Sequence, residues 1–214
     1  MKKQGLFITF EGVDGSGKTT IINNVKQELE KRIKNNKLNY LSVISTREPG
    51  GYENNFCESV RNLILQNEMS IKTEMLLFAA NRVEHLNQLI KPSLKENKIV
   101  LSDRFLDSSL VYQGIAKLNN WKIPYKINKW AFDTMPDITF LLDIDPEIAY
   151  KRMESDKNRT WDRFDNEKRE FKNKIRQGFL KMSKKFSKRF VVINANNTIE
   201  NIVNEIVNKI CQFK

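Results

Sequence analysis

The chain has 214 residues, of which 40% are hydrophobic, and this apolar content lets one globular domain bury its own core without disulfides or metals. Cys57, Cys211 and His85, the single histidine, stand at no metal-ligand spacing, which argues against a zinc site. No apolar run reaches the roughly 20 residues that cross a bilayer. We therefore expect a soluble cytoplasmic protein with free thiols, no membrane partner and a structural role for His85.

The net charge of +11, from 37 Lys and Arg against 26 Asp and Glu, raises the question of nucleic-acid binding. The lysines are scattered along helical faces, as in 31–37 and 181–188, without interleaved aromatic residues or a recognition-helix pattern. Solvated helix surfaces account for such a distribution. A nucleic-acid-binding protein would show salt-steep retention on DNA with little turnover of free nucleotides. We expect no nucleic-acid partner.

Strand-like and helix-like segments alternate from one end of the chain to the other. Apolar runs predict strands at Leu6–Phe10, Tyr40–Ile44, Ile99–Leu101, Ile138–Leu142 and Phe190–Ile193. Helical periodicity predicts helices at about 17–34, 54–67, 72–97, 107–117, 123–134, 146–155, 166–187 and 198–211. This order is typical of an α/β fold with a five-stranded parallel sheet and helices on both faces.

No linker or internal repeat divides the chain, so we expect a single domain over 1–214. The polar stretch 154–165, ESDKNRTWDRFD, lies between two predicted helices and could close over a site as a short lid.

A phosphate-binding loop follows the first predicted strand. The pattern G-x-x-x-x-G-K-[ST] is met in full by Gly12, Val13, Asp14, Gly15, Ser16, Gly17, Lys18 and Thr19. Backbone N–H groups of such a loop and of the following helix converge on nucleotide phosphates. We expect this segment, through Thr20, to bind ATP. Lys18 would bridge the β and γ phosphates, and Thr19 would offer its hydroxyl to Mg²⁺.

Four further segments narrow the class of nucleotide-binding protein. They are TREPGG at 46–51, LFAANR at 77–82, DRF at 103–105 and DSSLVYQG at 107–114. Together with FEGVDGSGKTT at 10–20, and in this order, they make the chain resemble the bacterial-type thymidylate kinases over nearly its whole length. The resemblance implies a P-loop kinase fold, a homodimer and the Mg²⁺-dependent transfer of the γ-phosphate of ATP to dTMP. The product, dTDP, would serve dTTP synthesis.

For the reacting phosphates, the resemblance implies roles for five side chains. Asp103 would hold Mg²⁺ or its waters, and Arg104 would contact the transferring phosphate. Arg47 would bind the acceptor phosphate, with Arg61 close by. Asp14 would face the 3′-hydroxyl of the acceptor sugar, although from the residues alone it could be a loop carboxylate that faces water.

For the base and sugar, the resemblance points to two helical faces. Phe78 and Arg82 are four residues apart, so they share a face; Phe78 would stack on the pyrimidine and Arg82 would meet O4 of thymine. Ser109, Tyr112 and Gln113 share another face. Gln113 would pair its amide with the thymine edge, and Tyr112 would crowd the 2′ position of the sugar. Without the resemblance, Phe78 could be core, and the other three residues could be polar helix surface.

No basic residue lies between Gly12 and Gly17, so a further donor to the transferring phosphoryl group must come from elsewhere. The stretch 154–165 offers Arg159 and Arg163. The segment DRFD at 162–165 is similar to the lid motif of bacterial-type members, so we favour Arg163 over Arg159.

Two other functions stay open at this point. One is a kinase for another nucleoside monophosphate, because only a few side chains choose the base. The other is a nucleotide-dependent switch, but a guanine-specific GTPase should carry Asn-Lys-x-Asp, and NKWA at 128–131 has alanine where the aspartate is needed.

Overall fold

The computed structural model describes residues 5–51, 55–156, 164 and 169–213. The strands in this part of the chain are β1 (Leu6–Glu11), β2 (Val43–Arg47), β3 (Ile99–Asp103), β4 (Ile138–Asp143) and β5 (Phe190–Asn194). The α-helices are α1 (Lys18–Lys34), α2 (Asn55–Gln66), α3 (Ile71–His85), α4 (Lys91–Lys95), α5 (Leu106–Ser109), α6 (Lys122–Ile127), α7 (Pro146–Ser155), α8 (Arg169–Lys185) and α9 (Ile199–Gln212). Two π-helical stretches, η1 (Leu86–Ile90) and η2 (Leu110–Lys117), and a 3₁₀ helix, η3 (Lys129–Thr134), complete the helical segments.

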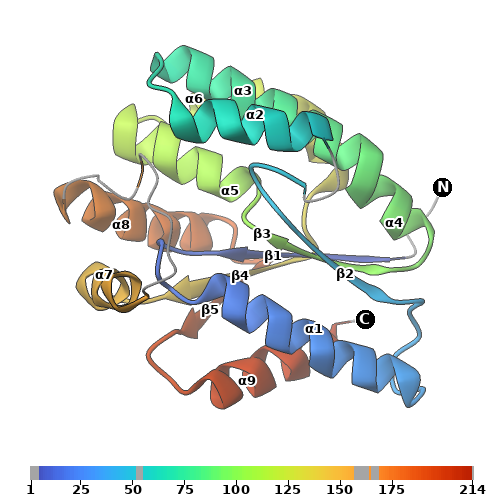
Figure 1. Ribbon diagram of the computed structural model, residues 1–214. Helices are drawn as coiled ribbons and strands as arrows, with labels where there is room; N and C mark the ends of the chain where they lie inside the picture. The colour runs from blue at the N-terminus through green and yellow to red at the C-terminus, as the bar shows by residue number, and fades with distance from the viewer. Residues whose placement is uncertain (1–4, 52–54, 157–163, 165–168, 214) are drawn as a thin grey trace.

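All strand pairs are parallel, in the order β2-β3-β1-β4-β5, so the predicted five-stranded α/β sheet is confirmed. The carboxyl ends of the strands point to one edge, at the left in Figure 1. Phe10 of β1 and Arg47 of β2 both pair with Asp103 of β3, so the loops after these three strands meet there. In open α/β sheets this edge is where ligands bind.

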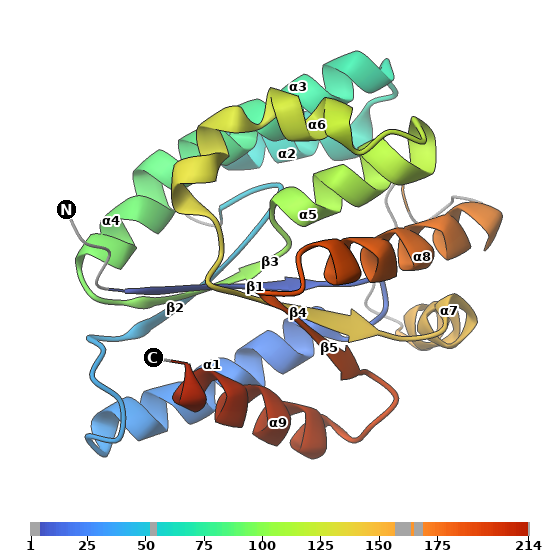
Figure 2. The ribbon, with the colours of Figure 1, turned by 180° about the vertical axis from the view of Figure 1, so that it is seen from behind.

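Helices cover both faces of the sheet. Helices α1 and α9 lie together on one face, and α2 to α6 with α8 lie on the other (Figures 1 and 2). Because β1 is enclosed from both sides, all of its residues are buried, and all of them except Thr9 and Glu11 are apolar. In the described segments, no helix is both long and apolar enough to cross a membrane.

The predicted second strand, Tyr40–Ile44, is wrong at both ends. Strand β2 pairs with β3 from Val43 to Arg47, while Leu41, before the strand, has a side chain that is 63% exposed. The apolar pattern fails here because β2 is an edge strand, and its polar second half, including Thr46 and Arg47, leads into the site. An apolar pattern reports which residues have buried apolar side chains, so it does not detect strand residues whose side chains are polar.

The single helix predicted at 72–97 consists of α3, η1 and α4 in sequence. Pro92 lies in the first turn of α4 and has no N–H to donate to a carbonyl one turn earlier. The π-helical stretch η1 lies directly before α4, and its wider turn accommodates the interruption of the regular α-helical hydrogen bonds. The helical path continues, but its hydrogen-bond spacing changes.

A buried ion pair ties α5 to the sheet. Both Nη atoms of Arg189 lie 2.7 Å from the carboxylate of Asp107, which is fully buried, and Nη1 also donates to Thr139 Oγ1 at 2.6 Å. Thr139 in turn hydrogen-bonds Thr9 across β1 and β4 at 2.9 Å. The network places the beginning of α5, and with it the residues that follow on η2, at a fixed position over the sheet.

Removing one partner of this pair should be costly, because it leaves a buried charge without compensation. We expect Asp107→Asn to lower the free energy of unfolding by about 3 to 5 kcal/mol. The matched control is Asp133→Asn, which breaks the 3.1 Å ion pair with Lys91 at a carboxylate that is 66% exposed, and which should cost under about 1 kcal/mol. Urea unfolding measures both values; equal losses in the two variants would contradict the role of the buried pair.

Candidate active site

The phosphate loop connects β1 to α1 and has a backbone that needs glycine. Gly12 has φ 144°, and a Cβ atom there would lie 2.7 Å from the carbonyl oxygen of Leu142. Lys18 begins α1, and its Nζ donates to the carbonyl oxygens of Val13 at 3.0 Å and Gly12 at 3.3 Å. Burial, with the charge of Arg104, lowers the pKa of Lys18. The side chain thus lies along the loop that is expected to hold phosphates.

Thr19 and Asp103 lie together beside this loop. Thr19 Oγ1 donates to Asp103 Oδ2 at 3.1 Å, which joins the first turn of α1 to the end of β3. A hydroxyl and a carboxylate are the hard oxygen ligands that Mg²⁺ prefers. These two residues therefore fit the metal that the phosphate-loop motif implies.

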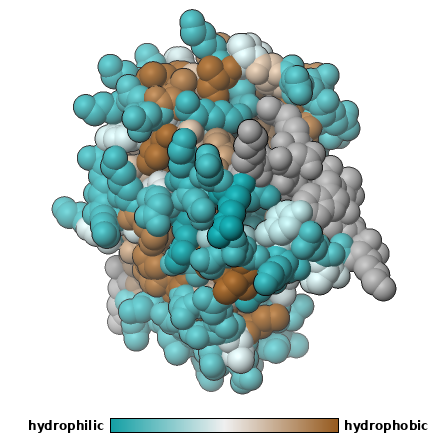
Figure 3. Space-filling model, turned by 90° about the vertical axis from the view of Figure 1, so that its left-hand side faces the viewer, coloured by the Kyte–Doolittle hydropathy of each residue, from teal (hydrophilic) through white to brown (hydrophobic). Residues whose placement is uncertain are grey.

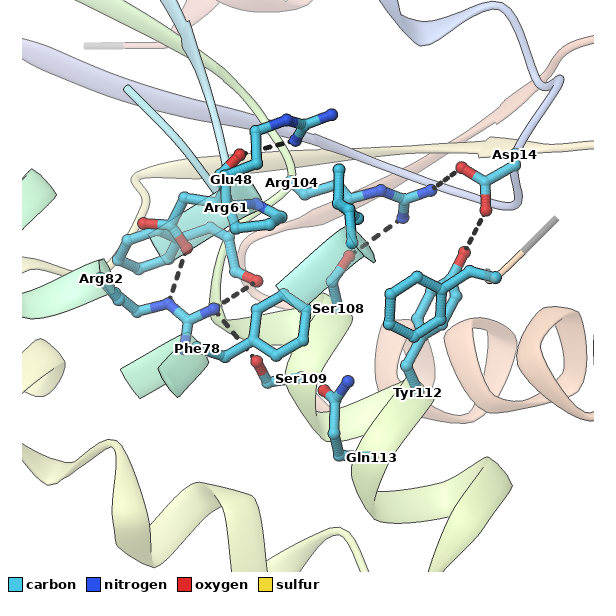
Figure 4. Close-up of a pocket in the computed structure, with 14 residues that line it drawn as sticks. Asp14, Glu48, Arg61, Phe78, Arg82, Arg104, Ser108, Ser109, Tyr112 and Gln113 are labelled. Atoms are coloured by element: carbon cyan, nitrogen blue, oxygen red, sulfur yellow. Dashed lines mark hydrogen bonds and ion pairs between the residues drawn. The ribbon is translucent and has the colours of Figure 1, made fainter. Parts of the chain in front are cut away.

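Asp14, Arg104 and Tyr112 form a second cluster, drawn in Figure 4. Arg104 Nη2 donates to Asp14 Oδ1 at 2.6 Å, and Tyr112 Oη donates to Asp14 Oδ2 at 3.0 Å. Burial opposes the charge of Asp14, but Arg104 and Lys18, with the two hydrogen bonds, outweigh it and lower the pKa of the carboxyl. Burial and the charge of Asp14 raise the pKa of Tyr112 well above its usual value, so the phenol stays a donor.

The turn that carries Arg104 is held by buried hydrogen bonds. Arg104 has φ 71°, a left-handed conformation that is costly for a residue with a side chain. Its N–H donates to Phe10 at 2.9 Å, and the next N–H, of Phe105, donates to Glu11 Oε1 at 2.9 Å. Glu11 Oε2 lies 2.6 Å from Ser108 Oγ, which also accepts from Arg104 Nη1 at 3.0 Å. Glu11 thus positions both the backbone and the side chain of Arg104.

Sequence reasoning did not single out Glu11. The signal was available, because an acidic residue that directly follows the largely apolar run Leu6–Phe10 is expected to lie close to the buried sheet. Burial and the nearby charge of Asp107 raise the pKa of Glu11 to about 8, although Arg104, Ser108 and Phe105 act in the opposite direction.

A pocket opens next to this cluster, toward α3 and η2 (Figure 4). It is lined by Asp14, Glu48, Pro49, Arg61, Leu65, Phe78, Arg82, Arg104, Phe105, Ser108, Ser109, Tyr112, Gln113 and Phe164. The structure therefore brings together the residues that the sequence assigns to the two helical faces, Phe78 and Arg82 on one and Ser109, Tyr112 and Gln113 on the other, although the two groups are 27 to 35 residues apart in the chain.

Arg82 is held from several sides and is 1% exposed. It donates to Glu48 Oε2 at 2.8 Å, to the carbonyl oxygen of Phe105 at 3.2 Å and to Ser109 Oγ at 3.1 Å. A further hydrogen bond goes to Asn128 Oδ1. The guanidinium is fixed in place, and Ser109 contributes to the pocket by holding it.

Glu48 links Arg82 to the single histidine. The ring of His85 contacts Glu48 Oε1 through Nδ1 at 3.0 Å and Thr46 Oγ1 through Nε2 at 2.7 Å. His85 is fully buried, and these contacts agree with the expected structural role. They also tie the loop after β2 to α3.

Gln113 has a buried partner that sequence reasoning missed. Its Nε2 donates to Glu74 Oε1 at 2.8 Å, and Lys117 Nζ lies 3.0 Å from each oxygen of Glu74. Glu74 is on α3 one turn before Phe78. A buried carboxylate at that spacing could have been found as a polar interruption of the apolar face of the helix.

Arg47 and Arg61 lie at the loop after β2. Arg47 Nη2 donates to Glu58 Oε2 at 2.8 Å, and Arg61 Nη1 donates to the carbonyl oxygen of Pro49 at 2.7 Å. The NH of Gly51 donates to the other oxygen of Glu58 at 3.0 Å, so α2 holds this loop closed.

A second cavity extends from here along the phosphate loop. It is lined by Asp14, Gly15, Ser16, Gly17, Lys18, Thr19, Thr20, Arg47, Glu48, Arg61, Asp103, Arg104, Arg152, Ala195 and Asn197, among others. It shares Asp14, Glu48, Arg61 and Arg104 with the first pocket. Viewed from this edge, the described surface is largely hydrophilic (Figure 3). Two adjoining cavities that meet at arginines suit a reaction between two phosphorylated molecules.

The comparisons with known proteins agree with this geometry. A family model described as thymidylate kinase matches residues 10–206. The chain belongs to the thymidylate kinase family. It is 42% identical over 207 residues to a thymidylate kinase of Clostridium novyi, covering 95% of this chain and 97% of that protein. It is 40% identical over 215 residues to one of Ligilactobacillus salivarius, covering 98% of this chain and 99% of that protein.

A solved structure gives the same result. The crystal structure of thymidylate kinase from Ehrlichia chaffeensis is 34% identical in sequence and superposes with a TM-score of 0.76, over 96% of this chain and 98% of that one. The resemblance to thymidylate kinases and the P-loop kinase fold are thereby confirmed. The expected lid arginines of this family member, Arg159 and Arg163, lie outside the described residues.

The raised pKa of Glu11 gives a pH test of how this site is built. Its carboxyl has a pKa of about 8 in the folded chain against 4.5 as an ordinary glutamate, so its contribution to stability is complete below about pH 4.5 and is lost as the pH rises toward 8. Asp14, whose pKa is lowered, loses its contribution only on acidification below its ordinary value of 3.8.

We therefore expect the free energy of unfolding of the wild type, measured relative to that of Glu11→Gln, to decrease as the pH rises from 5 to 8. The decrease should be on the order of 1 to 4 kcal/mol. Denaturant unfolding of both proteins across this range gives the difference, in which the contributions of groups that do not interact with Glu11 cancel. A difference that is constant with pH, or that grows in favour of the wild type, would contradict the raised pKa.

Proposed function

We propose that this member of the thymidylate kinase family transfers the γ-phosphate of ATP to dTMP, with ATP along the phosphate loop and dTMP in the pocket beside Phe78. The observation that supports this placement is the shared wall of the two cavities, formed by Asp14, Glu48, Arg61 and Arg104. Phosphoryl transfer needs donor and acceptor in line at such a junction. The product dTDP would feed dTTP synthesis.

On the donor side, the backbone N–H groups from Gly12 to Thr20 would bind the phosphates of ATP. Lys18 would leave the carbonyl oxygens of Val13 and Gly12 for the β and γ phosphates. Thr19 and Asp103 would hold Mg²⁺, which when bound neutralises charge on the phosphate oxygens.

On the acceptor side, Arg47 and Arg61 would bind the phosphate of dTMP, and Arg104 would contact the group in transfer. An oxygen of the acceptor phosphate attacks the γ-phosphorus, and the bond to the oxygen between the β and γ phosphates breaks. That acceptor oxygen is already ionised at neutral pH, so no general base is required. The residues act by holding the two phosphates close and by stabilising charge.

The nucleoside would lie across the rest of the pocket. Phe78 would stack on thymine, Arg82 would donate to O4, and Gln113 would contact the base edge. Asp14 would face the 3′-hydroxyl and Tyr112 the 2′ carbon. The hydrogen bond from Tyr112 to Asp14 supports this proposal, because it holds the two side chains together on the wall of the pocket.

Assembly and location complete the proposal. We infer a single catalytic domain over 1–214 that works in the cytoplasm as a homodimer. Large apolar side chains are exposed on the helical layer that includes α2, α3 and α6: Phe56, Leu63, Leu76, Ile123 and Trp130. Trp130, on η3, is 63% exposed, and Leu76 is 59% exposed. A second copy of the chain would remove such a surface from water.

The acceptor preference tests the function directly. Coupled ADP release with ATP and each of dTMP, dUMP, UMP, dCMP and dGMP should give the highest kcat/KM for dTMP. Loss of the 5-methyl group in dUMP should lower kcat/KM about 10-fold to 200-fold. Cytosine presents an amino donor to Arg82 where thymine presents an acceptor, and a site built for one rejects the other more strongly. Equal turnover of dCMP or dGMP and dTMP would exclude the assignment.

The lid arginine is tested by kinetics. Arg163→Ala should lower kcat by about a hundredfold or more, since an arginine that contacts the transferring phosphoryl group is worth about 10³ to 10⁵ in rate. The KM for dTMP should change little, because the contact forms chiefly in the transition state. Arg159→Ala is the matched control and should have the smaller effect. A double variant with a kcat near wild type would refute a lid-arginine mechanism.

A further inference from the structure

We propose that Glu74, which lies behind the base pocket and does not line it, is a positioning residue that determines which pyrimidine the pocket accepts. Its carboxylate fixes the amide of Gln113 so that the carbonyl oxygen is presented to position N3 of the base. This inference rests on the proposed placement of the base between Phe78 and Gln113.

The orientation of the Gln113 amide follows from the chemistry of its neighbour. Glu74 is paired with the ammonium of Lys117, 3.0 Å from each of its oxygens, and lies 2.8 Å from Gln113 Nε2. A carboxylate has oxygens that accept and no proton to donate. A flipped amide would place the Gln113 oxygen against an oxygen of Glu74. The nitrogen end must therefore face Glu74.

This leaves Gln113 Oε1 as the acceptor that the side chain can offer the pocket. Gln113 is 2% exposed and lines the pocket, and in Figure 4 its amide end points toward the ring of Phe78. A base stacked on Phe78 would have its edge against this amide. Rotating the amide to offer a donor would break the buried contact with Glu74, which is 1% exposed.

The pattern of donors and acceptors then selects the base. Thymine and uracil carry a donor at N3 and an acceptor at O4, which match Gln113 Oε1 and the guanidinium of Arg82. Cytosine carries an acceptor at N3 and a donor at N4, so it mismatches at both positions. The guanidinium of Arg82 can only donate hydrogen bonds, and Glu74 prevents Gln113 from presenting a donor in place of its acceptor.

A purely structural role fits these residues less well. A buried ion pair contributes little net stability compared with apolar side chains of similar volume. Glu74 on α3 and Lys117 on η2 join the two segments that supply Phe78 and Gln113, so the pair also sets how these two side chains face each other. Fixing the relative orientation of neighbouring segments is a better-supported role for buried polar groups than adding net stability.

The test is the ratio of the dissociation constants of dCMP and dTMP, measured by calorimetry on the wild type and on Glu74→Gln. A glutamine at position 74 can accept or donate, so the Gln113 amide gains the flipped orientation. We expect the preference for dTMP over dCMP to fall about tenfold or more. The matched control is Glu58→Gln, which alters the contact to Arg47; both acceptors share the phosphate, so their ratio should stay at the wild-type value.

A third variant separates this inference from the placement on which it rests. Gln113→Leu should weaken dTMP binding; if it leaves the affinities of both nucleotides unchanged, the placement of the base fails, and the role of Glu74 fails with it. If Gln113→Leu weakens dTMP binding while Glu74→Gln keeps the wild-type ratio, the role of Glu74 alone is overturned. Equal weakening of both nucleotides by Glu74→Gln, with a lower Tm, would also overturn it, because that is the result of a structural role.

Discussion

The parallel register between β1 and β3 is the constraint on which the site depends. It places Phe10 beside Asp103, and the N–H of Arg104 continues the pairing by donating to the carbonyl oxygen of Phe10. The phosphate loop begins two residues after Phe10, so the loop and the Asp103-Arg104 turn must lie side by side. A slip of the pairing by one residue would turn the side chain of Asp103 to the other face of the sheet.

Buried carboxyl groups hold three of the side chains that line the site. Glu11 holds the turn and side chain of Arg104 through Phe105 and Ser108, Glu48 holds Arg82, and Glu74 holds Gln113. Our proposal assigns none of these three carboxyl groups a contact with substrate. Such support costs desolvation during folding, and it removes the need to order these side chains when a ligand binds.

Much of the fold and of the candidate site could be predicted from the sequence, because these parts are determined by local sequence patterns. The apolar run of β1, the glycine-rich loop and the helix that begins at Lys18 are contiguous, and each is set by short-range rules. The second strand was misplaced because its second half, Ser45, Thr46 and Arg47, is polar and has no apolar period. The partners Glu48 and Asn128 were missed because they meet Arg82 from 34 and 46 residues away, which only tertiary structure decides.

The hydrogen bonding of Arg82 limits how this pocket could evolve. Its guanidinium joins four separate points of the chain: Glu48, the backbone at Phe105, Ser109 and Asn128. If Arg82 contacts the base as we propose, replacing it to accommodate a different base would leave buried acceptors unpaired at all four points, so a change of substrate would also lower stability. A lineage that moves toward another nucleotide must therefore alter several positions together or first acquire compensating stability elsewhere. If Arg82 meets the base as we propose, the side chain that selects the base is also one on which the stability of the fold depends.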